Sequence, residues 1–480
     1  MKFLQYAKVI FFILSCVVLS FILPIIFIFA YNEYEVLPSF LIPMIPTLLI
    51  TLVLVFTTKN YSFKLSTRGG ICLVAFAWIL TCLLGALPFF ISGAIQGFSN
   101  CVFESTSGFT TTGATILNEI EGLPKSILIW RAQTHWLGGM GIIVLAVALF
   151  PLLGIGGFTL IKSETTGPDK GKITPKIAET AKALWYIYAS LTVIQILALL
   201  LAGMNLTDAI SHSFSTLGTG GFSTKNASIG TYNSSIINYI CTVFMFLAAI
   251  NFSLYIRMFQ GHPEDTIKNS EFRAFIKIFF TCAILLGIAI IPKYGVFKAF
   301  EHSFFQVASV MSTTGFSSVN YNTWPEIAKF ILLFLFLIGG CSGSTAGGIK
   351  VVRWVILKKQ AGNEMKRVLY PHGVFSIQLN RQPGRMDVVY SVAGFIFLYL
   401  FLVVLTSCIA VLAGANVFSS IVTGLTLVGN IGAGFDMIAP DKSFLFFADW
   451  AKYFFSFSMI AGRLELYTML IMFNKNYWRK

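Results

Sequence analysis

The chain has 480 residues, of which 56% are apolar and only 11% are charged, whereas roughly 25% of the residues of a soluble domain are charged. This composition excludes a water-soluble enzyme, because no long stretch is polar enough to form the outer surface of a soluble domain. The formal net charge is +14, but the basic residues lie between apolar runs, which argues against a nucleic-acid-binding domain.

Ten segments are apolar enough to cross a bilayer, which takes about 20 mostly apolar residues in a helix. The first is too long for a signal peptide and lacks a small-residue cleavage site, so we expect it to be retained. The predicted spans are residues 7–30, 38–58, 69–93, 127–152, 183–204, 235–258, 274–292, 327–357, 386–413 and 444–473.

The basic residues between the spans predict the orientation of the chain, because Lys and Arg accumulate on the cytoplasmic side. If both termini are cytoplasmic, the inner segments hold 24 of the 34 Lys and Arg residues. One inner segment, 350–385, carries eight basic residues against Glu364 alone. This segment is either an ordinary orientation signal or a docking site for an acidic cytoplasmic partner.

Four gaps between spans contain a half-length apolar stretch and then a turn rich in glycine and hydroxyl residues. The turns read TTTGA (110–114), GTGGF (218–222), STTGF (312–316) and IGAGF (431–435). We align their fourth-position glycines, Gly113, Gly221, Gly315 and Gly434. The repeating unit is then a span, a re-entrant helix, a turn and a second span. It predicts pore repeats at 69–160, 161–260, 261–360 and 361–480, after a two-helix region at 1–68.

The four turns predict a pore, since non-helical backbone at membrane depth is tolerated only where protein buries it or where it lines a water-filled cavity. We therefore expect an all-α polytopic membrane protein with four turns around a pseudo-fourfold axis. Glycine allows a tight turn to aim carbonyl oxygens inward, and such oxygens can replace the water shell of a monovalent cation. The negative ends of the re-entrant helices would favour the same charge. These arguments do not choose between K⁺ and Na⁺.

Two features are expected beneath the turns. Arg463 lies in the middle of the last span, where an arginine must face protein or water. It either binds carbonyls of a neighbouring helix or forms an electrostatic barrier on the ion path, and we favour the barrier. The run GGCSGSTAGG (339–348) should break the eighth span, because interior glycines weaken a helix. It either packs against its neighbours or forms a mobile gate, and we favour the gate.

No catalytic motif is present. The five histidines form no HExxH, there is no GxSxG or phosphate loop, and the eight scattered cysteines form no paired metal motif. We therefore predict that the chain is not an enzyme. Glu104 and His212 each lie nine residues before an aligned glycine, where they are better placed to support the turns than to transfer protons.

Several stretches resemble the TrkH family, the membrane subunits of bacterial Trk potassium uptake systems within the Trk/Ktr/HKT superfamily. The resemblance covers nearly the whole chain. Its most specific stretches are SGFTTTGAT (107–115), HWLGGMGIIVLAVALFPLLGIGG (135–157), TPKIAETAKALWYIY (174–188), GGCSGSTAGGIKVVR (339–353) and GRLELYT (462–468).

The resemblance implies K⁺ uptake across the bacterial cytoplasmic membrane by a homodimer that binds a cytoplasmic TrkA-type nucleotide-binding regulatory subunit. It implies no bound cofactor, only K⁺ as the transported ion, and contact with membrane lipids but not with nucleic acid. The implied gating residues are Arg463 and Gly339, Gly340, Gly343, Gly347 and Gly348. The implied filter residues are Thr111, Thr112, Gly113, Thr219, Gly220, Gly221, Thr313, Thr314, Gly315, Gly432, Ala433 and Gly434.

This chain departs from the family pattern in two ways, since Ala433 brings no hydroxyl and the second and fourth turns lack a Thr-Thr pair. The main alternative is a secondary transporter of a small solute, coupled to Na⁺ or H⁺ and built on broken helices. That class predicts inverted repeats, whereas the units here recur in one orientation. The sequence leaves open whether transport is channel-like or coupled.

Overall fold

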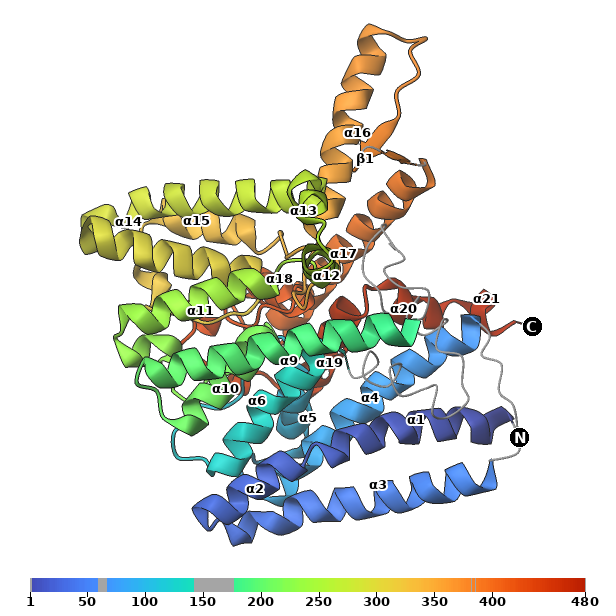
Figure 1. The fold of residues 1–480 in the computed structure, drawn as a ribbon, viewed down its shortest axis with the longest axis vertical. Coiled ribbons are helices and arrows are strands. Elements are labelled where there is room, and N and C mark those ends of the chain that lie inside the picture. The colour runs from blue at the N-terminus through green and yellow to red at the C-terminus, as the bar shows by residue number, and fades with distance from the viewer. Residues whose placement is uncertain (1, 59–66, 142–176, 381, 385, 480) are drawn as a thin grey trace.

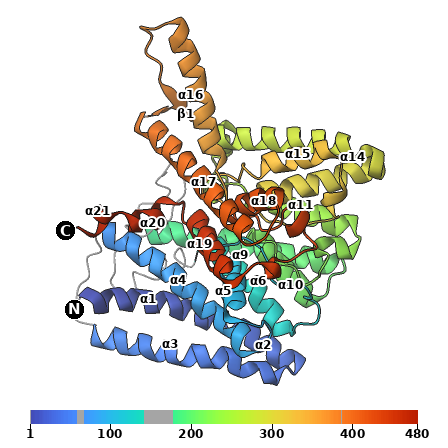
Figure 2. The ribbon, with the colours of Figure 1, turned by 180° about the vertical axis from the view of Figure 1, so that it is seen from behind.

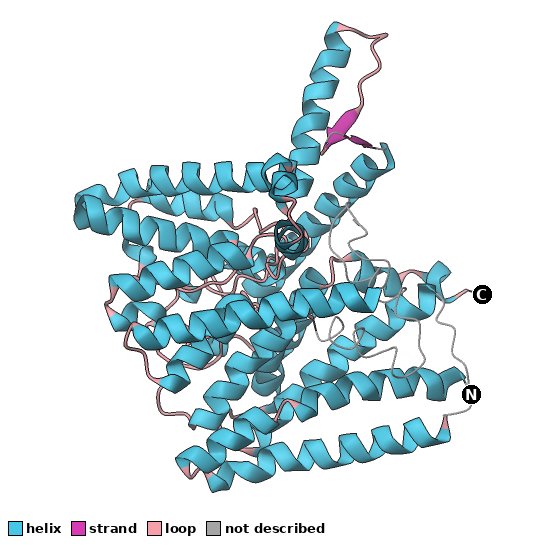
Figure 3. Cartoon of the chain, in the orientation of Figure 1, coloured by secondary structure: helices cyan, strands magenta, loops and turns pink. Residues whose placement is uncertain are grey.

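A computed structural model describes residues 2–58, 67–141, 177–380, 382–384 and 386–479. Long helices run side by side through the molecule, and both termini lie at one end of it (Figure 1). The described secondary structure is helical apart from one antiparallel hairpin, β1 (Ile377–Leu379) and β2 (Gln382–Gly384) (Figure 3). This hairpin is the one departure from the all-α prediction in the described part of the chain.

The N-terminal spans form where they were predicted. The first is α1 (Lys2–Leu19) continued by α2 (Ile22–Tyr31), and it is followed by α3 (Leu37–Thr57) and α4 (Thr67–Ile91). The hydroxyls of Ser15 and Thr51, 2.6 Å apart, join α1 to α3. The opposite side of α3 leaves Val53 and Phe56 60% and 72% exposed. An apolar face of this kind suits contact with lipid.

Six described helices are long and apolar enough to cross a membrane, or eight if two bent pairs each count as one span. One of the ten predicted spans needs correction, and another is described only in part. In the span predicted at 127–152 the structure describes α6 (Lys125–Gly139), and residues 142–152 lie outside the described residues. The span predicted at 327–357 divides into α15 (Glu326–Leu335) and α16 (Val351–Leu369), with the expected glycine-rich break between them.

Two further spans, predicted as straight helices, are broken. Helices α11 (Ser235–Ala248) and α12 (Phe252–Phe259) meet at 89°, and α19 (Asp449–Arg463) and the segment from α20 (Tyr467–Leu470) onward meet at 118°. Asn251 caps α12 at the first break. At the second break Glu465 and Leu466 both have positive φ, and a rarely populated backbone conformation costs roughly 1–3 kcal/mol per residue. Tertiary contacts must therefore hold the second break in place.

Four short helices lie where the half-length apolar stretches before the turns predicted them. Three have 12 residues each, α5 (Phe98–Phe109), α10 (Leu206–Leu217) and α18 (Val417–Val428). The fourth is the end of α14 (Ser270–Met311), beyond the kink at Gly295. Seen from behind, α5, α18 and α19 lie near the middle of the molecule (Figure 2). Each short helix ends at one of the four turns.

The remaining spans are α9 (Ile177–Leu201) and α17 (Met386–Leu412). Between α15 and α17, helix α16 leads away from the bundle and the hairpin returns toward it (Figure 1). We call α16 and the β1–β2 hairpin the arm. Ile356, Ile377 and Val389 pack together at its base in a small apolar cluster separate from the main core. The arm therefore has its own attachment to α17.

We predict that both termini are cytoplasmic, because this orientation puts most of the basic residues inside. A fluorescent protein that matures only in the cytoplasm should fluoresce when fused after Lys480, and alkaline phosphatase, which is active only outside, should be inactive there. The reverse pattern would contradict the orientation. A phosphatase fusion in the 226–234 segment, on the opposite side in this topology, is the matched control.

Candidate functional site

The four turns share one backbone conformation. Each has a left-handed residue directly after its helix cap, namely Thr111, Thr219, Thr313 and Asn430, with φ between 53° and 57°. Two residues later each has a left-handed glycine, namely Gly113, Gly221, Gly315 and Gly432, with φ between 78° and 85°. The N–H between them donates to the carbonyl five residues earlier at 2.8 or 2.9 Å in all four turns. The turns are therefore equivalent residue by residue.

This equivalence corrects the alignment of the fourth turn by two residues. The counterpart of Gly113 is Gly432, and Gly434 does not share its left-handed φ. The fourth turn is thus Asn430, Ile431 and Gly432, and Ala433 and Gly434 follow it. The alignment of Gly434 with Gly113 was wrong, because the end of α18 at Val428 sets the register of the fourth turn.

The four turns meet in a closed ring. A β-carbon built on each left-handed glycine would lie 2.0 to 2.2 Å from a carbonyl oxygen of the next turn, so only glycine fits there. The contacts join Gly113 to Gly220, Gly221 to Thr314, Gly315 to Ile431, and Gly432 to Thr112. Because the last contact returns to the first turn, the contacts form a closed cycle through all four turns.

His135 of α6 explains the missing threonine of the second turn. A β-carbon at Gly220 would lie 2.1 Å from its ring. The ring is fully buried; Nδ1 donates to the carbonyl of Gly108 at 2.8 Å, and Nε2 accepts the N–H of Phe222 at 3.2 Å. The imidazole therefore occupies the space that a threonine side chain would need.

Arg131, also on α6, ties the first two turns together. Its Nε donates to Glu104 at 2.6 Å and one Nη donates to the carbonyl of Ser223 at 2.9 Å. Its guanidinium lies 3.7 Å above the ring of Phe222. Glu104 in turn accepts the hydroxyl of Thr115, just beyond the first turn. This buried ion pair fixes the chain where it leaves both turns.

His212 occupies the position in α10 that Glu104 occupies in α5. Its Nε2 lies 2.9 Å from the hydroxyl of Ser223, and its Nδ1 lies 2.8 Å from the carbonyl of Asp208. Both ring nitrogens are thus engaged with the chain around the second turn. The contacts of both side chains agree with the expected supporting role.

Residues 339–350, which we call the Gly-rich loop, have ends that are joined to each other. The N–H of Gly339 donates to the carbonyl of Ile349 at 3.0 Å, and the N–H of Val351 donates to Gly340 at 3.2 Å. These two bonds form a neck from which the rest of the loop projects. The break is therefore an ordered loop rather than a simple kink.

The Gly-rich loop contacts both a broken helix and a turn. The N–H of Cys341 donates at 2.9 Å to the carbonyl of Ala249, which the break after α11 leaves free. The N–H of Gly347 donates to the hydroxyl of Thr313 at 2.7 Å. The loop thus lies against the helix-side end of the third turn.

Arg463 bridges the Gly-rich loop to α6. One Nη donates to the carbonyl of Thr345 at 2.7 Å, and the other donates to the carbonyls of Gly138 and Gly139 at 2.8 and 3.0 Å. These bonds match the interpretation that Arg463 binds carbonyls of a neighbouring helix. They also bring its positive charge to the space beside the loop.

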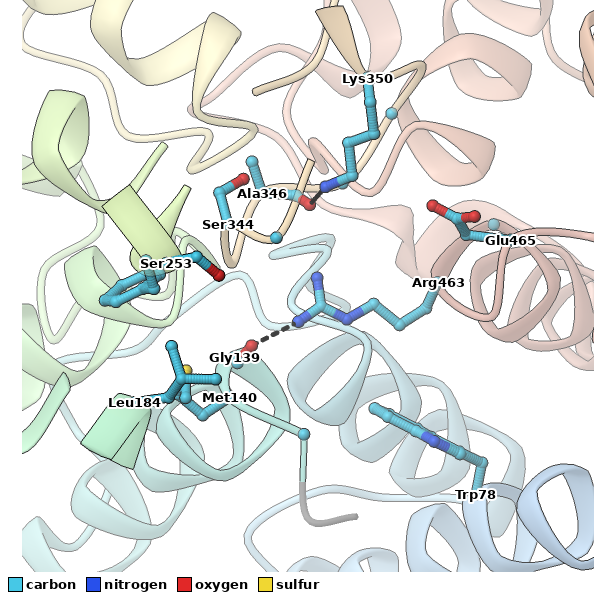
Figure 4. A pocket seen from close by; sticks show the side chains of 16 residues that line it. Trp78, Gly139, Met140, Leu184, Ser253, Ser344, Ala346, Lys350, Arg463 and Glu465 are labelled. Carbon is cyan, nitrogen blue, oxygen red and sulfur yellow. Dashed lines mark hydrogen bonds between the residues drawn. The ribbon is translucent and has the colours of Figure 1, made fainter. Parts of the chain in front are cut away.

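A cavity of about 160 Å³ lies at this place (Figure 4). Arg463, Lys350, Glu465 and several glycines of the Gly-rich loop line it. Lys350 donates to the carbonyl of Ala346, and Glu465 pairs with Arg353 of α16 at 2.7 Å. The cavity wall therefore carries two basic side chains and one carboxylate. The described residues include no group of three or more His, Cys, Asp and Glu that could hold a metal ion.

Ten of the twelve residues expected in the filter lie in the ring, and Ala433 and Gly434 lie just after it. Sequence reasoning missed Asn430, His135 and Arg131. A buried arginine in a predicted span is itself a sign of function, and this rule would have found Arg131. Asn tolerates the left-handed conformation better than other side chains, but nothing in the sequence marked Asn430 as the counterpart of three threonines.

The fold and this site define an all-helical polytopic membrane protein. A family model described as TrkH, a cation transport protein, matches residues 37–480. The chain belongs to the TrkH family. This membership agrees with the prediction that it is a transporter and not an enzyme.

Named relatives support the assignment. The chain is 41% identical over 433 residues to the Trk system potassium uptake protein TrkH of Vibrio parahaemolyticus, covering 88% of this chain and 89% of the relative. It is 39% identical to TrkH of Escherichia coli K12, covering 87% of each. The crystal structure of the potassium transporter TrkH from Vibrio parahaemolyticus matches with a TM-score of 0.88 and 36% identity, covering 100% of both chains.

We predict that Gly220→Thr destabilises the protein, although threonine occupies the same position in two other turns. The new side chain would overlap His135, and overpacking of this kind costs about 1–3 kcal/mol. The midpoint of thermal unfolding in detergent should fall, and adding His135→Ala should recover part of the loss. The exposed Gly122→Ala is the control, since its β-carbon meets nothing within 4 Å. An unchanged midpoint in Gly220→Thr would contradict the packing argument.

Proposed function

We propose that this chain is the K⁺-conducting membrane subunit of a Trk-type uptake system in the bacterial cytoplasmic membrane. The observation that carries the proposal is the closed ring of glycine-to-carbonyl contacts between the four turns. Four equivalent turns on one axis supply stacked rings of peptide oxygens, and such rings can replace the water shell of a monovalent cation. The names of the relatives make K⁺ the expected cation.

The electrostatics of the turns support a cation. Helices α5, α10, α14 and α18 all end at the turns, so their negative ends meet there. Within the described part of the chain, Thr111 Oγ1 and Asn430 Oδ1 are buried side-chain oxygens without a hydrogen-bond partner. We assign them to the inner end of the filter as additional ligands for a dehydrated ion. Asn430 would then replace, in the fourth unit, the hydroxyl that threonine brings elsewhere.

Arg463 and the Gly-rich loop form the gate in this proposal. The loop contacts the third turn through Gly347 and Thr313, and Arg463 holds the loop through Thr345. A cation 4 Å from a fixed positive charge meets a barrier of about 4 kcal/mol at an effective dielectric constant of 20. The hydrogen bonds of Arg463 and its charge both favour the closed state.

The proposed unit is four pore repeats at 69–160, 161–260, 261–360 and 361–480, assembled as a homodimer with cytoplasmic termini. A TrkA-type regulatory subunit would bind the cytoplasmic face. The described basic residues of the arm, among them Lys358, Lys359 and Lys366, offer positive charge to such a partner. Dimer mass by light scattering and co-purification with the regulatory subunit would test these assignments.

Uptake of ⁸⁶Rb⁺ into liposomes that contain the purified chain tests the function directly. We expect uptake driven by an outward KCl gradient alone, without any imposed H⁺ or Na⁺ gradient. Uptake that requires an H⁺ or Na⁺ gradient would favour a coupled secondary transporter, for which the two bent helix pairs are the supporting observation. No uptake under either condition would contradict transport by this chain on its own.

We expect Gly113→Ser and Gly432→Ser each to lower the selectivity for K⁺ over Na⁺. A side chain at either site would push a carbonyl of the next turn out of place. The ratio of permeabilities should fall on the order of tenfold, which corresponds to about 1.4 kcal/mol. Competition of Na⁺ with ⁸⁶Rb⁺ uptake measures it, with Gly122→Ser as control. An unchanged ratio in both variants would contradict the filter assignment.

We expect Arg463→Ala to raise cation flux by at least about tenfold, because it removes both the charge and the loop contact. Arg463→Lys separates the two effects, since lysine keeps the charge but cannot bridge three carbonyls. Low flux in the lysine variant would assign the barrier to charge, and high flux would assign it to the hydrogen bonds. The exposed Arg257→Ala, which removes a surface ion pair with Asp265, is the matched control. Unaltered flux in a well-folded Arg463→Ala would remove Arg463 from the gate.

A further inference from the structure

A buried carboxylate clamps the neck of the Gly-rich loop. Glu271 lies in the first turn of α14 and is 8% exposed. One of its oxygens accepts the N–H of Ser342 at 2.6 Å and the N–H of Val352 at 3.1 Å. Ser342 lies at the start of the loop and Val352 in the first turn of α16. A single carboxylate oxygen therefore bridges the two ends of the loop, in addition to the two backbone hydrogen bonds of the neck.

The charge of Glu271 suits this position. The N-terminus of α16 presents free N–H groups with a partial positive charge, which favours an acceptor oxygen at this place. Hydrogen bonds to an ionised group are about twice as strong as neutral ones. An ionised Glu271 would therefore hold the neck more strongly than a neutral side chain of the same shape.

The same helix also holds the far part of the loop. Helix α14 runs from Ser270 to Met311 with a kink at Gly295, and the part beyond the kink leads into the third turn, where Thr313 accepts the N–H of Gly347. The loop is therefore bound to α14 at its neck through Glu271 and, through the turn that α14 enters, at Gly347. Release of the neck would leave the Gly347 contact to hold the loop against this element.

The arm contacts Ser270, the residue directly before Glu271. Asn380, at the tip of the β1–β2 hairpin, accepts the N–H of Ser270 on its side-chain oxygen at 2.8 Å, and its own N–H donates to the hydroxyl of Ser270 at 3.4 Å. Ser270 directly precedes Glu271. Helix α16 begins at the neck of the loop, and the hairpin that follows α16 returns to the first turn of α14, which contains Glu271.

We propose that Glu271 is a latch that holds the Gly-rich loop closed, and that the hairpin of the arm transmits cytoplasmic events to it through Ser270. This inference rests on the proposed gate. Glu271 acts as a positioning residue, because it contacts the loop and not the ion path. Movement of the arm, for example by a bound regulatory subunit, would shift Ser270 and Glu271 together and loosen the neck.

The rate at which Cys341 is chemically modified can measure how often the neck of the loop opens. Its side chain is 1% exposed and lies next to Ser342. A variant that keeps Cys341 and replaces the seven other cysteines, Cys16, Cys72, Cys82, Cys101, Cys241, Cys282 and Cys408, with alanine would provide the background. A charged methanethiosulfonate reagent added from the cytoplasmic side should modify Cys341 slowly in this background.

We expect Glu271→Gln to speed the modification of Cys341 by at least about tenfold, the scale of one charge-assisted hydrogen bond, and to raise ⁸⁶Rb⁺ flux. Glu271→Asp should give an intermediate rate, because it keeps the charge but shortens the reach. Asn380→Ala should act in the same direction. The exposed Glu264→Gln, which removes a surface ion pair with Lys268, is the matched control and should change neither reading.

The two measurements test the role of Glu271 as a latch separately from the role of the Gly-rich loop as a gate. Faster modification of Cys341 together with higher flux supports both. Faster modification with unchanged flux supports the latch but contradicts the gate role of the loop. An unchanged modification rate in folded Glu271→Gln, judged by a single size-exclusion peak, overturns the latch. If Glu271→Gln does not fold, an unchanged rate in Asn380→Ala overturns the transmission from the arm.

Discussion

The arrangement of this protein depends on one close approach, the contact of a left-handed glycine in each turn with a carbonyl oxygen of the next. The contact leaves no room for a β-carbon, and the positive φ strains any other residue. Because the contacts pass through all four turns and return to the first, no turn can move without its neighbours. The four short helices behind them are thereby held next to one another through their turns.

The same ring requires support on its outer side, and α6 provides much of it. His135 fills the space beside the second turn, and Arg131 joins the chain beyond the first and second turns. Both are buried polar groups, which cost free energy unless they are hydrogen-bonded. Each is bonded to backbone or to a carboxylate. Polar side chains thus appear inside the membrane region where they hold non-helical backbone in place.

The Gly-rich loop and Arg463 provide hydrogen-bond partners for carbonyl groups at the ends of α6 and α11. A helix that ends inside a membrane leaves backbone carbonyls without partners, and each unpaired group costs several kcal/mol. The carbonyl of Ala249 is taken by the loop, and those of Gly138 and Gly139 are taken by Arg463. In the proposed gate, movement of the loop would exchange the partners of these carbonyls. The latch at Glu271 would set how readily that exchange begins.

The sequence alone determined the class of the protein, the six long helices that the structure describes, the four short helices before the turns and the glycine-rich break, because each depends on local composition and length. It did not determine the register of the fourth turn, the two further helix breaks, or the roles of His135, Asn430 and Glu271. Those depend on which backbone groups from distant segments meet. Only tertiary structure decides this, since a left-handed glycine or a buried acid is selected by the atoms packed against it and not by its neighbours in the chain.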